Sequence, residues 1–527
     1  MAYSNNRSTF FCPAGTKWYW EFVPTTNYNY ASCGITTNSH EWDINPGGGN
    51  STPSGHGVGI YGAELDVDGT RGVATVTAWA SGDIIGFAYD VDDNNLKYYI
   101  NGSLSYTYTS VPASTDGPYS PSFGDFGGAA AATINVNFGA DSSFGGLKTA
   151  QGNQDSNGMG DFYYEPPTDY LALCSSNLAS PEIALPEENF ETVLFTGTGA
   201  TRTVATSFQS DFAWFKQRGG ATNHLLYNST TGGTNALASN TTAAEAQHGD
   251  AVLTFNSANI QIAGTDTGGL NGDTESMVLW NWKAGTSVSG TTGGAGTGTA
   301  YSGSASATAG FSIIKYVGNS TAGHGIPHHL GVAPEMFIVK NRDDAGTGWM
   351  VYHKDLTSYL YFIALDDNGA EVTGVSNDRW YSVPDATYNY LQEDLDVNEV
   401  NEADNYIMYS FAGIEGYSKV GSYVGNGNAD GNFLYTGFKP ALLLVKNIDT
   451  ASRNWTILDN KRNTFNPEDE WLYPNLTDAT WDASSYPMDF TASGFKIRHN
   501  GTYFNTDDDS YIYIAFAESP FKYSNAR

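Results

Sequence analysis

The chain has 527 residues, among them 60 Gly and 34 Tyr, and only 15% of its residues are charged. Its formal net charge is −32, from 56 acidic and 24 basic residues, so we expect no binding to nucleic acid and none to anionic membranes. No apolar run of about 20 residues predicts a membrane span, and the first residues lack an apolar signal region, so we expect synthesis in a cytoplasm. Three cysteines, Cys12, Cys33 and Cys174, are too few for a disulfide framework and are expected to be reduced.

The amino-acid composition predicts an all-β protein. Tyr, Phe, Trp and Thr suit a pleated, half-buried surface, and Gly, Asn and Asp supply the turns between strands. We find no convincing run of apolar residues at helical spacing. The length corresponds to several domains. We therefore expect a string of antiparallel β-sandwich modules.

The N-terminal part, residues 1–145, carries several strand signals in a row. The segments are residues 17–22, 82–90, 96–102, 118–123 and 134–139. The third of them runs into an Asn-Gly turn, which is a strong hairpin signal. In this order the segments resemble the SPRY domain, which has a concanavalin-like β-sandwich. The resemblance covers residues 14–140 and implies an antiparallel sandwich whose loops bind a partner.

Three repeats are expected after a connector at residues 146–184. A lysine ends an apolar run at Lys216, Lys340 and Lys446, and an aromatic residue closes a second apolar run 66, 71 and 70 positions further on. The repeat predicts β modules at residues 185–285, 309–420 and 421–527. Between the first two modules, residues 286–308 are almost all Gly, Ser, Thr and Ala, which predicts a flexible linker.

The repeated lysines could be mistaken for catalytic groups. Each one ends an apolar strand, so we favour a lysine at a strand edge that blocks pairing with another chain. The residues that close the second apolar run, Trp282, Phe411 and Phe516, are expected in one equivalent core position.

The repeats also resemble a known family. The resemblance lies in four sequence segments, residues 279–285, 332–342, 437–440 and 516–522. They are similar to an uncharacterised domain family found in virion and tail-fibre-like proteins of tailed bacteriophages, over residues 165–527. The resemblance implies a virion structural protein, a tail-fibre or appendage component that contacts other virion proteins and binds host surface glycan or a receptor. Such a fibre would be a homo-oligomer, with a trimer favoured. A capsid-decorating protein and a glycan-degrading tailspike stay open as alternatives.

The sequence shows no recognisable arrangement of catalytic residues. No nucleophile elbow, phosphate loop or dinucleotide fingerprint is present. His324, His328 and His329 are close enough in sequence to hold a transition metal, but their Gly- and Pro-rich context favours a solvated loop. The acidic runs at residues 90–93 and 507–509 offer oxygen ligands for Ca²⁺ without matching a calcium-loop pattern. We therefore expect no enzyme activity, no metal site and no cofactor, with calcium kept as an alternative.

The aromatic residues suggest where a ligand would bind. Trp18, Trp20, Trp280 and Trp282 alternate within strand patterns and are expected in the core. Trp42 and Tyr61 lie in a loop-like context beside polar residues, as is common on sugar-binding surfaces. We take these two as the candidate ligand-binding residues, with loop packing as the alternative.

Overall fold

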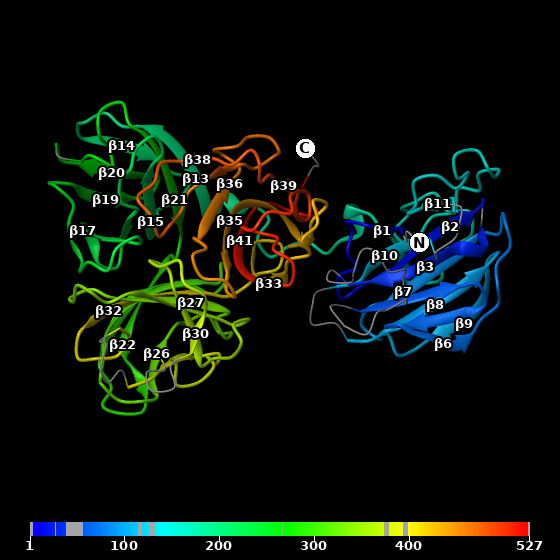
Figure 1. The fold of residues 1–527 in the computed structure, drawn as a ribbon, viewed down its shortest axis with the longest axis horizontal. Helices are drawn as coiled ribbons and strands as arrows, with labels where there is room; N and C mark the ends of the chain where they lie inside the picture. Colours follow the sequence, from blue (N-terminus) through cyan, green and yellow to red (C-terminus); the bar gives the residue numbers. More distant parts are fainter. Residues whose placement is uncertain are drawn as a thin grey trace. The chain divides into compact units, whose positions relative to one another are not determined.

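The computed structural model describes residues 4–26, 28–37, 56–113, 118–125, 132–265, 267–373, 379–393 and 399–524. Strands form nearly all of the regular structure there, beside three short 3-10 helices, η1 (Tyr28–Tyr30), η2 (Ser175–Asn177) and η3 (Pro186–Glu188). The expected all-β class is confirmed. The chain divides into two compact units, Met1–Ala179 and Ser180–Arg527 (Figure 1). No helix within the described ranges is long and apolar enough to cross a membrane.

The first unit is a β-sandwich of two six-stranded sheets. One sheet contains, in spatial order, β1 (Ser4–Arg7), β10 (Ser120–Asp125), β3 (Ala31–Thr36), β4 (Gly57–Tyr61), β5 (Glu64–Val67) and β6 (Thr70–Thr75). The other contains β11 (Ile134–Asn137), β2 (Lys17–Pro24), β7 (Ile85–Asp90), β8 (Asn95–Ile100) and β9 (Ser103–Tyr108) in spatial order, and its sixth strand, β12 (Tyr170–Ala172), also pairs with β2. Phe22 on β2 packs edge-on against Phe123 on β10, with ring centroids 5.8 Å apart, so the two sheets face each other. Trp18 and Trp20 are fully buried between them, as expected.

Residues 146–179 belong to the first unit, so the expected separate connector at 146–184 is wrong. Strand β12 (Tyr170–Ala172) pairs in parallel with β2. The buried carboxylate of Glu21, also on β2, accepts hydrogen bonds from the backbone N–H groups of Tyr163 and Tyr164, at 2.8 and 2.9 Å. A buried carboxylate must be hydrogen-bonded, and this segment supplies the donors. The segment therefore completes the sandwich and is no spacer.

The second unit contains three modules. The strands of module 1 are β13 (Phe190–Thr196), β14 (Arg202–Ala205), β15 (Phe212–Gln217), β16 (Leu225–Asn228), β17 (Gly232–Ala238), β18 (Ala246–Gln247), β19 (Val252–Asn256), β20 (Asn259–Ala263) and β21 (Ser276–Trp282). The strands of module 2 are β22 (Thr286–Thr291), β23 (Gly293–Gly294), β24 (Ala300–Ser306), β25 (Phe311–Val317), β26 (His324–Pro327), β27 (Met336–Asn341), β28 (Trp349–His353), β29 (Tyr361–Ala364), β30 (Val372–Thr373), β31 (Tyr388–Leu391) and β32 (Asn405–Phe411). The strands of module 3 are β33 (Ser418–Val424), β34 (Phe433–Tyr435), β35 (Phe438–Asn447), β36 (Thr456–Asp459), β37 (Glu470–Trp471), β38 (Trp481–Asp482), β39 (Met488–Thr491), β40 (Gly494–Ile497) and β41 (Ser510–Pro520).

One strand order occurs in all three modules. The large sheet of module 1 runs β13-β21-β15-β16-β17-β18, and its small sheet runs β14-β20-β19. In module 2 the matching order is β25-β32-β27-β28-β29-β30, and in module 3 it is β33-β41-β35-β36 with the small sheet β34-β40-β39. The lysines occupy equivalent positions, as expected, because each pairs with the last long strand of its module: Lys216 with Val278, Lys340 with Ile407, and Lys446 with Ile512.

The lysines do not lie at sheet edges, so the expectation that they block edge pairing is wrong. Strands β15, β27 and β35 each have a neighbour on both sides. Each lysine is at most 1% exposed. The apolar residues that precede each lysine indicate a central strand buried on both faces. The lysine lies on the same strand and is therefore buried as well.

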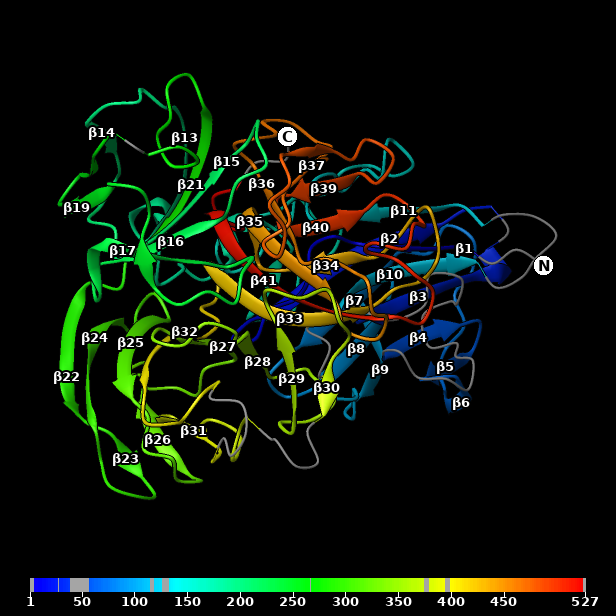
Figure 2. The same ribbon diagram turned by 60° about the vertical axis from the view of Figure 1, so that its left-hand side comes forward.

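Residues 286–308 form strands, so the expected flexible linker is wrong. Strand β22 pairs with β24 over six residues, β24 pairs with β25, and β23 reaches across to β26 in the small sheet. The half-buried Val288 and Tyr301 pack on the core of module 2. Two anchoring side chains are enough to hold this Gly/Ser/Thr segment, because its backbone groups are satisfied within the sheet. Figure 2 shows β22, β24 and β25 side by side.

The antiparallel β modules expected from the sequence share one central core in this unit, a feature that the sequence did not predict. The core lies among the large sheets, while each module keeps a second core between its own two sheets. Trp282, Phe411 and Phe516 meet at the centre. Ring centroids lie 5.5 Å apart for Trp282 and Phe516, and 6.1 Å apart for Phe411 and Phe516. A cavity of about 30 Å³ remains there, lined by apolar and aromatic side chains of all three modules. Figure 1 shows the green, yellow and orange-to-red modules grouped around this centre.

The modules contact one another in a closed cycle. Lys216 of module 1 donates to the carbonyl of Thr477 in module 3 at 3.1 Å. In the same way Lys340 of module 2 reaches module 1 and Lys446 of module 3 reaches module 2, at the carbonyls of Thr242 (3.4 Å) and Gly369 (2.7 Å). A backbone hydrogen bond repeats at each seam: Thr480 to Arg218, Glu245 to Arg342, and Glu371 to Ile448. One chain therefore forms an internal three-membered ring.

Replacing Phe516 with alanine should lower the free energy of unfolding of the second unit by about 3–5 kcal/mol, because the ring is 2% exposed and stacks on Phe190 at 5.1 Å. Denaturant unfolding followed by tryptophan fluorescence measures the change. Phe465→Ala is the matched control. Its ring is 75% exposed, so the free energy should change by no more than about 0.5 kcal/mol. Equal effects of the two substitutions would contradict the shared core.

Candidate functional site

The seam lysines are closed off from solvent. Burial lowers the pKa of Lys216 and of Lys340 to about 8 and that of Lys446 to about 7. Each ammonium donates to backbone carbonyl groups, and Lys340 also donates to the hydroxyl of Thr347 at 2.9 Å. A lysine nucleophile needs an open approach. These groups instead join neighbouring modules.

The three histidines that the sequence singled out, His324, His328 and His329, have separate partners. His324 is fully buried in β26, where its ring nitrogens lie 2.7 Å from Asn401 Oδ1 and 2.7 Å from Thr292 Oγ1. His328 reaches the carbonyl of Asp385 at 3.0 Å, and His329 reaches the hydroxyl of Tyr301 at 2.9 Å. The expectation of a solvated loop is wrong for the first two, which are buried. Among the described residues, no group of three or more His, Cys, Asp or Glu side chains could hold a metal ion.

The two acidic runs are tied into local hydrogen bonds. Asp90 forms an ion pair with Lys17 at 2.7 Å, and Asp92 accepts from the backbone N–H of Gly15 at 2.9 Å. In the other run, Asp509 accepts from the side-chain amide of Asn447 at 2.8 Å and from Thr450 at 3.1 Å. These contacts give the carboxylates structural roles at turns.

Of the two predicted ligand-binding residues, Trp42 lies outside the described residues. Tyr61 is the last residue of β4, where it pairs with Ser32 and Glu64. The expected loop context is therefore wrong for Tyr61. Its side chain is half-buried, and the guanidinium of Arg71 lies 5.4 Å from the ring centroid. Part of the ring is thereby covered from ligands.

Module 3 carries an aromatic surface, which we define as Trp481, Tyr486 and Tyr503. Trp481 is 36% exposed, and the two tyrosines are half-buried. Trp481 lies 5.7 Å from Tyr503 and 6.0 Å from Tyr486 between ring centroids. The fully buried Trp471 supports the surface from below, with Trp481 set edge-on at 5.1 Å. Four aromatic rings from one short segment and one turn thus form a continuous cluster that reaches solvent.

The local sequence explains how this surface forms. Strands β37 and β38 make a small hairpin in which Trp471 pairs with Trp481. The chain then turns back, and the N–H of Tyr486 donates to the carbonyl of Ala483 at 2.7 Å. Tyr503 comes from the turn that precedes β41. Gly501 is required beside it, because a Cβ there would lie 2.4 Å from the ring of Tyr486.

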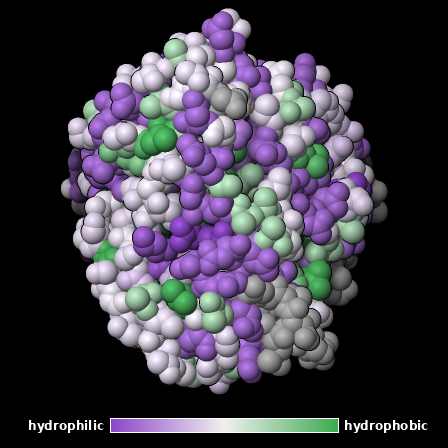
Figure 3. Space-filling view, turned by 90° about the vertical axis from the view of Figure 1, so that its left-hand side faces the viewer, coloured by the Kyte–Doolittle hydropathy of each residue, from purple (hydrophilic) through white to green (hydrophobic). Residues whose placement is uncertain are grey.

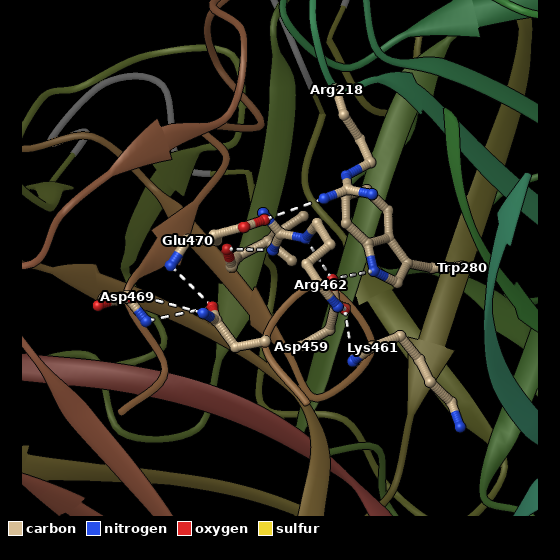
Figure 4. Close-up of polar contacts among 9 residues, drawn as sticks. Arg218, Trp280, Asp459, Lys461, Arg462, Asp469 and Glu470 are labelled. Atoms are coloured by element: carbon tan, nitrogen blue, oxygen red, sulfur yellow. Dashed lines mark hydrogen bonds and ion pairs between the residues drawn. The ribbon is translucent and has the colours of Figure 1, made fainter. Parts of the chain in front are cut away.

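The hairpin is fixed to module 1 across the seam. The N–H of Thr480 donates to the carbonyl of Arg218 at 2.8 Å, and the guanidinium of Arg218 pairs with Glu470 at 3.1 Å. Beside this pair, the buried Asp459 binds Arg462 at 2.6 Å and accepts from the indole N–H of Trp280 at 3.0 Å. Figure 4 shows the contact of Arg218 with Glu470 beside those of Asp459 with Arg462 and Trp280. A ligand that stacks on Trp481 would meet a preformed, rigid surface.

The chemistry around the aromatic surface disfavours anionic ligands. Residues 469–486 contain acidic and hydroxyl side chains but no Lys, Arg or His. Asp478, Asp482 and Ser484 of this segment are exposed. Elsewhere, on the face drawn in Figure 3, hydrophilic side chains predominate and strongly hydrophobic ones are scattered singly. Isolated apolar residues of this kind do not indicate a broad protein interface.

The geometry defines an all-β protein made of a sandwich unit and a three-module ring. The chain belongs to the family described as "Domain of unknown function (DUF7483)", whose model matches residues 185–520 and so spans the ring. No curated protein matches the chain.

About a quarter of the chain is similar to solved SPRY domains. The SPRY domain of human HERC1 has 13% sequence identity and a TM-score of 0.22, and the match covers 26% of this chain and 82% of that one. A human SPRY domain has 15% identity and a TM-score of 0.20, with 26% and 84% covered. The TRIM65 PSpry domain has 17% identity and a TM-score of 0.20, with 25% and 69% covered. The β-sandwich assignment itself rests on the strand pairing described above.

Replacing Lys340 with methionine should make the free energy of unfolding less dependent on pH. The folded-state pKa of about 8 lies below the ordinary 10.5, so the unfolded chain binds more protons between these values. Stability from this lysine therefore rises as pH increases from about 8 to 10.5. Denaturant unfolding at several pH values gives the difference between wild type and variant, which should grow with pH.

The comparison with a variant is needed because burial also raises the pKa of Glu468 to about 9, and that carboxyl titrates in an overlapping range. Lys461→Met removes the same charge at an exposed position and corrects for net charge. A wild-type minus Lys340→Met difference that stays constant with pH would show that the lysine does not titrate in this window.

Proposed function

We propose that the protein is a bacteriophage virion structural protein, a tail-fibre or appendage component that binds the host surface without chemical turnover. Residues 332–342 and the three similar sequence segments named above resemble proteins of tailed-phage virions, and this resemblance supports the virion location. The proposal includes assembly in the host cytoplasm, contact with other virion proteins, and attachment to a host surface glycan or receptor.

The observation that carries the binding role is the aromatic surface of module 3. Exposed aromatic faces stack on the apolar faces of sugar rings, and tyrosine hydroxyls add hydrogen bonds at the margin. The neighbouring Asp482 and Ser484 can accept and donate hydrogen bonds to sugar hydroxyls. Because residues 469–486 lack a cation and the chain is strongly acidic, the surface suits a neutral, hydroxyl-rich glycan better than an acidic polysaccharide.

The ring supports this role mechanically. Recognition residues are commonly placed on loops and hairpins held by a rigid scaffold. The hairpin of Trp481 is held by its own module and by Arg218 of module 1, so little ordering is needed when a ligand binds. Affinity at one such site would be modest, and many copies on a virion would raise it through multivalency.

Replacing Trp481 with alanine in the full-length protein should weaken binding to host cells or to their extracted surface polysaccharide by about tenfold or more, because the stacking face is lost. Binding isotherms with labelled polysaccharide measure the change. Tyr381→Ala is the matched control. It removes a tyrosine in module 2 that is 51% exposed and lies outside the aromatic surface, and it should leave binding unchanged. Trp481→Ala also removes packing against Trp471, so circular dichroism at the assay temperature establishes that each variant is folded when binding is measured.

Other outcomes would replace parts of the proposal. Equal binding by wild type and Trp481→Ala would remove the site from module 3, and the pair Trp42 and Tyr61 would then be tested by double replacement. Absence of host binding, with the protein located on the capsid shell, would favour a decorating protein. Release of reducing sugar from the polysaccharide would favour a glycan-degrading tailspike.

A further inference from the structure

Strand β22 forms the outer end of the eight-stranded large sheet of module 2. The sheet continues inward through β24 and β25, and β22 pairs only with β24 among the residues that the structure describes. Its sequence is Thr-Ser-Val-Ser-Gly-Thr. Five of these six residues are exposed, and Val288 alone is half-buried because it packs on the core of its module. One row of backbone N–H and C=O groups on β22 therefore has no described strand beside it.

This edge lacks the features that normally prevent strand pairing between chains. Proteins protect sheet edges with very short strands, charged residues, prolines or bulges. Other ends of the large sheets have such features: β18 and β30 contain two residues each, β13 carries Glu191, and β33 carries Lys419. By contrast β22 has six residues, no charge and no proline, and its register with β24 shows no bulge. Modules 1 and 3 have no described strands equivalent to β22 and β24, so this edge is an addition to the common fold.

The charge distribution identifies the partner. The chain carries 56 acidic residues, yet none occurs between Glu275 and Glu335, a segment that includes β22 and its two inner neighbours β24 and β25. Two copies with a net charge of −32 repel each other over most of their sequence. Here the edge and the strands behind it are free of carboxylates. Antiparallel pairing of β22 with itself places small, uncharged residues opposite one another and satisfies the free backbone groups of both copies.

We propose that β22 is a self-association surface through which two copies of this chain pair edge to edge, antiparallel, about a twofold axis. The two eight-stranded sheets then continue into one another, and the same residues contribute from both copies. Because the ring already supplies three modules within one chain, this contact adds a second level of assembly and joins rings in pairs.

The experiment compares full-length wild type with Ser289→Lys by sedimentation equilibrium over a range of concentrations. Ser289 is exposed on β22, and a lysine there places a charge at the edge that both copies share. Wild type should form dimers, and Ser289→Lys should weaken the dimer by about tenfold or more. Thr308→Lys is the matched control: Thr308 is exposed like Ser289 but lies in the turn between β24 and β25, so the lysine adds the same charge away from the free edge.

Three results would overturn the proposal. One is a monomeric wild type at the highest concentrations reached. Another is an undiminished dimer in Ser289→Lys, since the contact would then lie elsewhere. The third is an equal loss of dimer in both variants, since added charge and not the edge would then explain the effect. Circular dichroism and thermal unfolding of each variant establish that the sheet is intact when association is measured.

Discussion

Burial of the central face of each large sheet is the constraint on which the second unit depends. A sheet with two apolar faces cannot be stable beside water on either side. Each module covers one face with its own small sheet, and the other face packs against the two neighbouring modules. Trp282, Phe411 and Phe516 occupy equivalent positions on these inner faces, so each contributes to a core that no single module could complete. The ring therefore buries both faces of each of the three large sheets.

The seams show how polar groups are accommodated beside this core. A buried lysine in each central strand costs desolvation, and its pKa falls as a result. Each ammonium offsets part of that cost by donating to a carbonyl of the next module, at Thr477, Thr242 or Gly369. These carbonyls lie in loops that have no strand partner of their own. The same three contacts thus satisfy loop backbone and fix the rotation of one module against the next.

The sequence predicted the all-β class and the equivalence of the three lysines, because strand content and repeated spacing are local features. It did not predict ring closure, since a repeat period carries no information on which faces are covered by which module. The prediction of a flexible linker at residues 286–308 was wrong because composition alone suggests flexibility, whereas the half-buried Val288 and Tyr301 and regular strand pairing hold the segment in the sheet. Trp481 was missed because Trp471, ten positions earlier, and Tyr503 become its neighbours only after the hairpin and the turn before β41 have formed. The apolar residues before each lysine are typical of a central strand. They could have been used to predict that the lysine is buried, in place of the prediction that it lies at a sheet edge.

The closed cycle also sets an order of events during synthesis. Lys216 and its carbonyl partner Thr477 are separated by 261 positions, so module 1 leaves the ribosome long before its second neighbour exists. Until β41 is made, the inner face around Trp282 has no cover from module 3, and the nascent chain exposes an aromatic surface that can aggregate. Completion of the ring must therefore wait for the C-terminal strand, which carries Phe516 into the centre. The risk of aggregation is therefore greatest before the last hundred or so residues are translated.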